Sequence, residues 1–156
     1  MIPAIQVDFK FSHSFVNRKA RQVPLHTHAF WQLEVIGEGP LRLLESGGHR
    51  DLLPGQAILI PEEWPHGFAY PDRTVSWTTC KFRLSGMTHP RKILRLEDDP
   101  LLEPLLSALR ILADTPRPDL QTDRFNHLLA ALLQPVAASL RPPPSTEEAF
   151  LQGIEN

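Results

Sequence analysis

Short runs in which hydrophobic and polar residues alternate make up roughly the first half of the chain. Turns that contain glycine, proline or aspartate separate these runs, which is the pattern of half-buried β-strands. The predicted strands lie at about 23–28, 31–36, 40–45, 49–52, 57–60, 66–70 and 74–84. A looser alternation over 2–16, with Ile5, Val7, Phe9 and Phe11 on one side, predicts an opening strand or arm. Many short strands at this spacing are typical of a β-sandwich or a β-barrel.

Beyond these strands the pattern becomes helical. Residues 93–96 can form a last strand, and the acidic residues and proline at 98–100 are a typical helix start. Leucines spaced by three or four residues follow, and a second helix start near 119–123 introduces another apolar face, which Pro135 should kink or interrupt. Such leucine faces pack helices on each other and on a barrel. The helices have more leucines than this packing needs, which also fits a homodimer formed through these C-terminal helices.

The last residues of the chain have a third pattern. Three prolines at 142–144 predict a stiff linker, and residues 145–148 have the sequence of a helix capping box. An amphipathic helix then begins, but the sequence stops about two turns later. Phe150, Leu151 and Ile154 therefore have no following segment to bury them. We expect this chain to be one part of a longer protein.

The composition is that of a soluble globular protein. The 156 residues are enough for one core domain with an appendage and too few for two full domains. Hydrophobic residues make up 42% and charged residues 22%, which argues against a disordered chain. No apolar run approaches the roughly 20 residues of a membrane span, and the N-terminus does not have the pattern of a secretion signal. We expect a cytoplasmic protein without a membrane partner.

The distribution of charge and the single cysteine further limit the functions expected of this chain. Residues 1–96 carry 12 basic and 8 acidic side chains, whereas residues 97–156 carry 4 basic and 10 acidic ones. Neither part has a basic stripe of the kind that binds phosphates, so this chain is not expected to bind DNA by itself. Cys80, the single cysteine, lies in a predicted strand and is expected to be a small core residue.

Candidate chemistry is concentrated in two passages, of which the first contains two histidines. His26 and His28 are two residues apart, so both imidazoles point to the same side of an extended strand. A straight strand would place Gln32 about 13 Å beyond His28, which is too far for a shared site. The chain must therefore turn near 29–31, which brings Gln32 or Glu34 back beside the histidines. These two polar residues alternate with apolar ones and share one face of the next strand.

The second passage supplies a third histidine. Residues 54–55 form a turn, residues 57–60 form a short apolar strand, and the proline-bounded loop 61–65 places His66 at the start of another strand. Three histidines brought together by a turn and two strands predict a site for one metal ion or one polar ligand.

The two passages resemble the two motifs that define the cupins. The first motif, G-x5-H-x-H-x3-E-x6-G, falls on Ala20, His26, His28, Gln32 and Gly39. The second motif, G-x5-P-x-G-x2-H-x3-N, falls on Gly55, Pro61, Glu63, His66 and Tyr70. All spacings fit, and the residues that depart from the motifs are Ala20, Gln32, Glu63 and Tyr70. The resemblance implies a mainly β fold, a jelly-roll barrel (double-stranded β-helix) followed by two or three C-terminal α-helices.

The resemblance also implies a metal site. Its ligands would be His26, His28, His66 and Gln32, the last in the position of the family's glutamate. These residue types suit one divalent transition metal, either Zn, Ni, Fe or Mn. A neutral amide gives the site less charge with which to hold a cation, so an occupied site and a metal-free site both stay open. Glu34 is an alternative to Gln32.

Within the cupins, the passages HAFWQL, PGQAILIP and WPHGF are similar to the sensing domain of AraC-type transcription regulators. The motifs that carry the similarity lie within about residues 5–85. The order of the predicted elements extends the similarity to the C-terminus. It implies a cupin barrel with an N-terminal arm over 1–96 and a helical dimerisation segment over 97–141. Residues 142–156 would be a linker and the start of a truncated DNA-binding domain. DNA would then be contacted only through that C-terminal domain, which is missing from this sequence.

Three interpretations of function follow from these residues. In the first, the chain is a ligand-sensing and dimerisation domain without enzymatic activity, and a small effector binds inside the barrel. Polar contacts would come from His26, His28, His66, Gln32 and Glu34, and apolar walls from Phe30, Phe68, Trp77 or Phe82. The alternatives are a metal-dependent cupin enzyme of the dioxygenase or isomerase type and a purely structural dimer module. We favour the first, because the linker and the leucine-rich helices suit a regulator.

Overall fold

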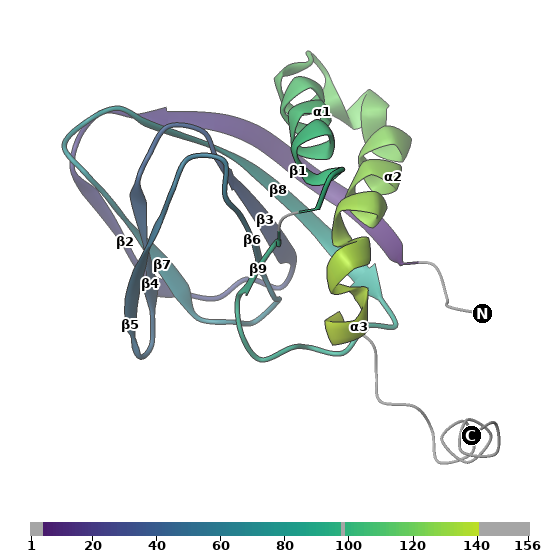
Figure 1. Cartoon of the computed structure of the whole chain (residues 1–156), viewed down its shortest axis with the longest axis horizontal. Helices are drawn as coiled ribbons and strands as arrows, with labels where there is room; N and C mark the ends of the chain where they lie inside the picture. The colour runs from purple at the N-terminus through teal and green to yellow at the C-terminus, as the bar shows by residue number, and fades with distance from the viewer. Residues whose placement is uncertain (1–4, 98, 141–156) are drawn as a thin grey trace.

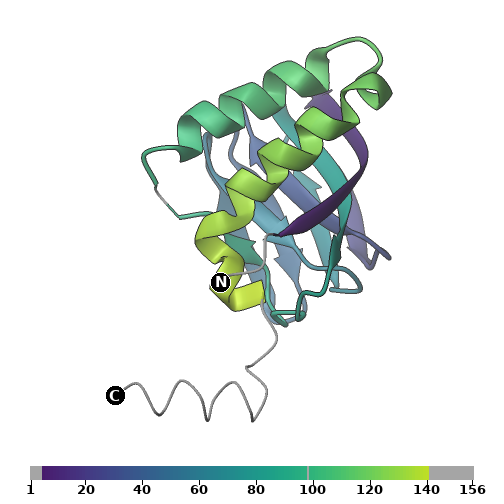
Figure 2. The same cartoon turned by 90° about the vertical axis from the view of Figure 1, so that its right-hand side faces the viewer.

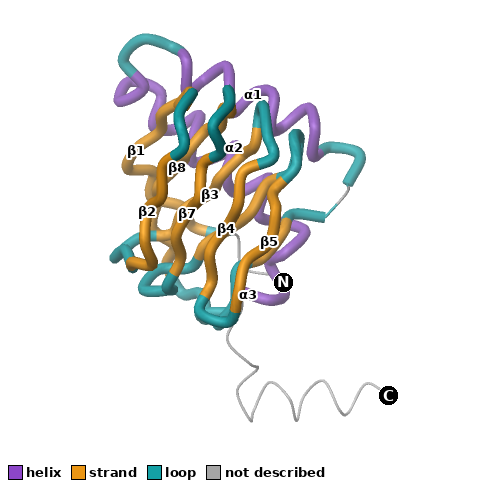
Figure 3. The backbone as a smooth tube through the Cα atoms, turned by 90° about the vertical axis from the view of Figure 1, so that its left-hand side faces the viewer, coloured by secondary structure: helices purple, strands orange, loops and turns teal. Residues whose placement is uncertain are grey.

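Two antiparallel sheets face each other and enclose the interior of a barrel (Figure 1). The structure is a computed structural model that describes residues 5–97 and 99–140. The larger sheet has the strand order β1-β8-β3-β6-β9, and the smaller sheet, which faces the viewer in Figure 3, has the order β2-β7-β4-β5. The strands are β1 (Gln6–Asn17), β2 (Arg21–His26), β3 (Trp31–Ile36), β4 (Leu41–Glu45), β5 (Gly48–Leu52), β6 (Ala57–Ile60), β7 (His66–Tyr70), β8 (Val75–Ser85) and β9 (Leu94–Arg95). The predicted mainly β jelly-roll barrel is confirmed.

β1 departs from the regular alternation expected for the opening strand. Its pairing with β8 shifts register between Phe9, which lies opposite Phe82, and Phe11, which lies opposite Lys81. Phe9 is buried, whereas Phe11 is 42% exposed. The expectation that both phenylalanines lie on one side is therefore wrong, because a bulge inserts an extra residue and changes the face to which the following side chains point.

β3 contributes to both sides of the larger sheet. All six of its side chains are buried. Trp31 and Leu33 pack in the hydrophobic layer toward the helices, whereas Ile36 belongs to the cluster between the two sheets. Gln32 and Glu34 alternate with the helix-facing residues, so the face that they share looks into the barrel. This central strand therefore separates the candidate site from the helical layer.

Two main helices cover the outer face of the larger sheet (Figure 2). The helical elements are α1 (Leu102–Asp114), η1 (Pro118–Gln121), α2 (Thr122–Leu133), η2 (Gln134–Val136) and α3 (Ala137–Leu140). Before α1, the backbone N–H of Leu101 donates to the Asp99 carboxylate at 2.9 Å. α2 ends just before Pro135, which agrees with the predicted interruption. None of the helices that the structure describes is long and apolar enough to span a membrane.

An aromatic pair attaches α2 to the larger sheet. The rings of Phe9 and Phe125 stack with their centroids 4.0 Å apart, and the backbone N–H of Phe9 donates to the side-chain oxygen of Asn126 at 2.8 Å. The surrounding hydrophobic layer also contains Leu106 and Leu129. Much of the predicted leucine surplus is therefore buried inside the chain. The linker and last helix that the sequence predicts over 142–156 lie outside the described residues.

Candidate functional site

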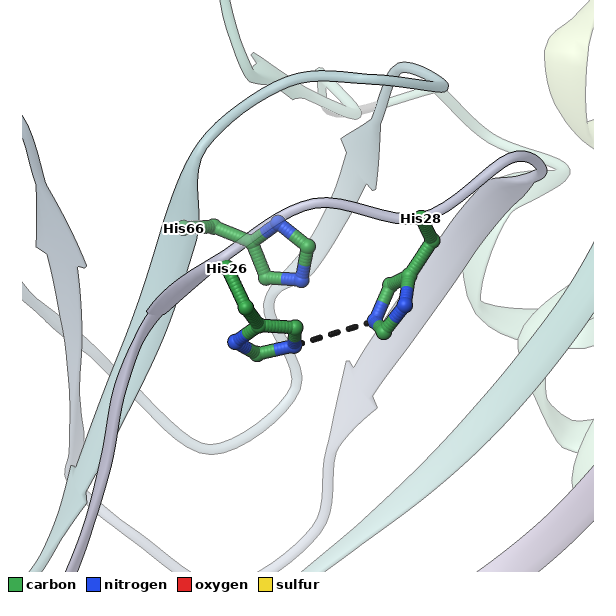
Figure 4. A group of neighbouring side chains, drawn as sticks. All are labelled: His26, His28 and His66. Atoms are coloured by element: carbon green, nitrogen blue, oxygen red, sulfur yellow. Dashed lines mark hydrogen bonds between the residues drawn. The ribbon is translucent and has the colours of Figure 1, made fainter.

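Three histidines converge where β2 and β7 meet the loop that precedes β3 (Figure 4). β2 ends at His26, which pairs with His66 at the start of β7. His28 follows two residues later, where the chain turns toward β3. One ring nitrogen of each histidine lies within 4.8 Å of the other two. The pairing of β2 with β7 holds His26 opposite His66, and His28 lies two residues beyond it, before the chain enters β3.

Backbone carbonyls fix the orientation of two of these rings. Nδ1 of His26 lies 2.8 Å from the Pro24 carbonyl oxygen, and Nδ1 of His66 lies 2.9 Å from that of Trp64. An imidazole that donates a hydrogen bond from Nδ1 carries its lone pair on Nε2. Nε2 of His66 is buried without a partner among the described residues, and Nε2 of His26 lies 3.1 Å from Nε2 of His28. Nε2 of His26 and of His66 therefore carries a lone pair, and Nε2–H of His28 can donate to that of His26 (Figure 4).

Burial favours the neutral form of two of these imidazoles. Desolvation lowers the pKa of His28 from 6.5 to about 4, and the charges of the two other histidines and of Lys81 act in the same direction. Desolvation also lowers the pKa of His66, although its hydrogen bond to the Trp64 carbonyl opposes this change. Neutral imidazole is the form that binds metal ions, so the site does not need a high pH to be ready for one.

A hydrogen-bonded group of polar side chains lies on the adjacent face of β3. Gln32 donates from Nε2 to Oε1 of Glu34, and both residues are at most 5% exposed. The Thr79 hydroxyl lies 3.0 Å from each carboxyl oxygen of Glu34. Burial raises the pKa of Glu34 from 4.5 to about 8, although the bonds from Gln32 and Thr79 act the other way. Near neutral pH this carboxyl group is therefore mostly protonated.

The donor atoms at this position fit a divalent transition metal. Three imidazoles offer nitrogen ligands, and the amide oxygen of Gln32 is buried without a partner among the described residues. Glu34 is occupied by Gln32 and Thr79, so it is better placed to orient the Gln32 amide than to bind the ion itself. The three-histidine group can therefore hold a metal ion, and Gln32, whose amide oxygen is unpaired, lines the same cavity as His26 and His28.

A cavity of about 290 Å³ opens next to the histidines. The predicted site residues in its lining are His26, His28, Gln32, Glu34, Phe68 and Trp77. The other predicted residues are close neighbours of that lining. The ring of His66 lies 4.5 Å from that of His26, and the ring of Phe30 stacks on that of His28 at 4.7 Å, both measured between centroids.

Phe82 lies on the opposite face of β8 and does not line the cavity. Its side chain is fully buried in the hydrophobic layer toward the helices. Trp77 and Phe82 are five positions apart, so the alternation of a strand places them on opposite faces. The expectation that either could form an apolar wall of the cavity is therefore wrong for Phe82.

Sequence reasoning missed eight further lining residues, four of which add polar or charged groups to the part of the cavity next to β7 and β8. Thr79 and Lys81 share the parity of Trp77 on β8, so extending the alternation from that tryptophan would have found them. Arg21 and Tyr70 lie opposite each other where β2 and β7 pair. Tyr70 shares the face of Phe68 on β7, so the alternation would have found it as well, whereas Arg21 is brought to the cavity only by the pairing of β2 with β7.

Several solved structures are similar to this chain at low sequence identity. A cupin superfamily protein from Desulfitobacterium hafniense is 14% identical, with 53% of this chain and 71% of that protein covered and a TM-score of 0.41. The DMSP lyase DddQ from Ruegeria pomeroyi is 21% identical, with 49% of this chain and 38% of the lyase covered and a TM-score of 0.42. The polyketide cyclase RemF from Streptomyces resistomycificus is 19% identical, with 72% of each chain covered and a TM-score of 0.44. No curated protein matches the chain.

A protein-family model gives the more specific match. The model of the AraC-like ligand binding domain matches residues 15–142, which is most of the chain. The matched range contains the histidine cluster, the cavity and the helices that cover the larger sheet. Sequence motifs, barrel topology and this match agree. The chain therefore belongs to the family of AraC-like ligand-binding domains, with a cupin fold.

Proposed function

We propose that this chain is the ligand-sensing and dimerisation domain of a cytoplasmic transcription regulator of the AraC type. A small effector binds in the 290 Å³ cavity, and its binding changes how a C-terminal helix-turn-helix domain is presented to DNA. The observation that carries the proposal is this cavity, lined by polar and aromatic side chains, inside a barrel of the AraC-like family. No bond has to form or break, because an effector acts by binding two conformations unequally.

β8 provides a physical connection between the cavity and the helices. Trp77 and Thr79 line the cavity from one face of this strand. Cys80 and Phe82, on the other face, belong to the hydrophobic layer that holds α1 and α2. A ligand that displaces the cavity face of β8 would therefore change the packing of the helices, because both faces share one backbone.

The helices are also the proposed dimer interface. Leu101 and Ile111 are 63% and 69% exposed, although most leucines of α1 and α2 are at least partly buried. A mainly apolar hollow of about 440 Å³ lies between the two helices, with Leu101, Leu105 and Leu132 in its lining. Exposed apolar surface of this kind often marks a protein interface. A homodimer joined through these helices would cover it.

A small-molecule screen tests the sensor function. We expect hits to raise the melting temperature of the chain and to quench tryptophan fluorescence, because Trp77 lines the cavity. The Trp77→Phe variant should lose most of the quenching. The Trp31→Phe variant should keep it, because Trp31 lies on the helix side of β3. A broad library without a hit, together with unchanged stability of His26→Ala, would instead favour the purely structural dimer module.

A metal-dependent enzyme of the dioxygenase or isomerase type is the second candidate, and the histidine cluster is the observation that favours it. A bound Zn, Ni, Fe or Mn ion would supply Lewis-acid or O2-activating chemistry. His26, His28 and His66 would hold the ion, Gln32 would complete its ligands, and Glu34 would orient the Gln32 amide. The cavity beside the cluster would position the organic molecule.

Metal analysis tests the histidine site, and product analysis separates the two candidates. We expect chelator-treated protein to rebind one divalent ion per chain and His66→Ala to lose this binding, whereas His49→Ala, on the exposed strand β5, should retain it. Metal-loaded protein is then incubated in air with a hit from the screen. Recovery of the unchanged molecule supports the sensor. Its oxidation or isomerisation at catalytic rates would support the enzyme.

A further inference from the structure

The charges in the cavity lining are unequal. Lys81 and Arg21 both line the cavity, and no ion pair in 5–97 or 99–140 involves either of them. Glu34 is the single carboxyl group in the lining, and both of its oxygens are already occupied by neighbours. The cavity therefore has two cations without an anionic partner in the described part of the chain.

Lys81 is the cation at the histidine end of the cavity. On β8 it lies opposite Gln32, and its ammonium group is 4.9 Å from the ring centroid of Phe30, which stacks on His28. It is also 5.3 Å from the ring centroid of Phe11. Aromatic rings hold an ammonium group in place, but they bind it less strongly than a carboxylate does. The two rings thus hold the Lys81 ammonium group at a defined position, and it can still bind an anion.

The neutral polar groups argue against a sugar as the occupant. A sugar needs several free donors and acceptors around its hydroxyl groups, and Gln32, Glu34 and Thr79 are the buried polar side chains of the lining. Their donors already bond within the group, because the Gln32 amide N–H and the Thr79 hydroxyl are both directed at Glu34, and the Gln32 amide oxygen is the acceptor that stays free. Freeing them for a ligand would break buried hydrogen bonds, which is costly.

The far end of the cavity is aromatic. The rings of Trp77 and Tyr70 stack at 4.7 Å, those of Phe15 and Trp77 at 5.4 Å, and Phe68 lies beside Tyr70 with centroids 6.2 Å apart. All four residues line the cavity. Flat apolar groups pack well against such rings. The volume of about 290 Å³ lies at the small end of the range for ligand pockets, so the occupant has only one or two rings.

We propose that the effector is a small aromatic carboxylate, with its carboxylate paired to Lys81 beside the histidines and its ring packed against Tyr70 and Trp77. This inference rests on the proposed sensing function and names the chemical class that the cavity selects. The carboxylate supplies the anion that the described lining lacks, and the ring fills the aromatic end.

Calorimetric titration of the chain with matched probes tests the inference. The probes are 2-naphthoate, the uncharged 2-naphthamide of nearly the same shape, and L-arabinose. We expect naphthoate to bind at least tenfold more tightly than naphthamide and arabinose not to bind. Lys81→Met should remove this preference, and Lys81→Arg should restore much of it. Arg83→Met, an exposed cation on the same strand, should leave it unchanged. The melting temperatures of all variants check that they are folded.

Three results would overturn the inference. If wild-type protein binds the amide as tightly as the acid, or if folded Lys81→Met keeps the preference, the carboxylate is not held by Lys81. If arabinose binds and naphthoate does not, the barrel is a sensor of another ligand class, and the sensing function stands. If no probe binds, an aromatic carboxylate is not the occupant, and the library screen decides about sensing itself.

Discussion

Glu34 is a carboxyl group whose chemistry depends on its burial. It is 2% exposed, and its partners Gln32 and Thr79 are also buried. Water is therefore replaced by two hydrogen bonds, which compensate only part of the lost hydration of a charge. The outcome is a pKa of about 8 in the folded chain, against 4.5 for an ordinary glutamate.

The first prediction concerns the pH dependence of stability in chelator-treated protein. Because the pKa of Glu34 is raised on folding, the folded state keeps a proton that the unfolded state has lost, so stability falls as pH rises from 4.5 to 8. The lowered pKa of His28 acts oppositely, but only between about 4 and 6.5. Between pH 6.5 and 8 we therefore expect the free energy of unfolding to fall by about 1 kcal/mol per pH unit.

Urea unfolding at several pH values in this window measures the effect. The Glu34→Gln variant keeps the shape of the side chain without its titration, so its stability should vary little between pH 6.5 and 8. Glu38→Gln, an exposed residue just after β3, is the matched control and should keep the wild-type slope. Equal slopes for wild type and Glu34→Gln would contradict the raised pKa.

At the scale of elements, the contact between β2 and β7 decides whether the histidines meet. Gly67 follows His66 on β7, and a Cβ atom at this position would lie 2.5 Å from the Val23 carbonyl oxygen and 3.0 Å from the Pro24 carbonyl carbon. Only a residue without a side chain allows β2 to lie this close. The glycine therefore holds His26 and His66 opposite each other.

The second prediction follows from this close approach. Gly67→Ala should push β2 away from β7, lower the free energy of unfolding by about 1–3 kcal/mol, and weaken metal binding by the histidines. Gly47→Ala is the control, because a Cβ atom there meets nothing within 4 Å, and it should be nearly neutral. Urea unfolding and metal titration measure the two effects. A wild-type stability for Gly67→Ala would mean that the strands can separate without cost.

The third prediction concerns the attachment of α2 to β1. Phe125 is fully buried and stacks on Phe9, so Phe125→Ala should lower the free energy of unfolding by about 3–5 kcal/mol. Arg124→Ala, an exposed neighbour on the same helix, should change it by less than about 0.5 kcal/mol. Urea unfolding compares the two variants. If both changes were small, α2 would not depend on this aromatic contact.

In the whole molecule, the larger sheet is a partition with chemistry on one face and helices on the other. β3 and β8 contribute to both faces, because their residues alternate between the cavity and the helical layer. A change in the cavity is thus one strand away from α1 and α2. This arrangement suits a protein in which a change in the cavity alters how the helices α1 and α2 are placed.

The fourth prediction is that the chain forms a dimer through the hollow between α1 and α2. Leu101→Glu places a charge at the edge of this hollow and should weaken the dimer at least tenfold, as measured by sedimentation equilibrium. Leu53→Glu, at an exposed leucine of the barrel, is the control and should not change the dissociation constant. A wild-type chain that stays monomeric at high concentration would contradict the proposed interface.

The sequence by itself determined the strands, the helices and the histidine cluster. Alternation with period two placed Gln32 and Glu34 on one face of β3, because side-chain direction along a strand is a local property of the backbone. The spacing of His26 and His28 and the turn after them were also local. The loop 61–65 placed His66 at the start of another strand, and the cupin motifs supported its grouping with His26 and His28, although it lies far away in the chain.

Only the tertiary structure decided which residues face the cavity and what their surroundings do to them. Phe82 is excluded and Lys81 included because β8 has one definite side toward the barrel, and the bulge after Phe9 depends on how β1 pairs with β8. The pKa of Glu34 depends on burial by segments distant in sequence, with Thr79 45 positions away. Desolvation and charge act through space, so the pKa of a buried group depends on neighbours that are distant along the chain.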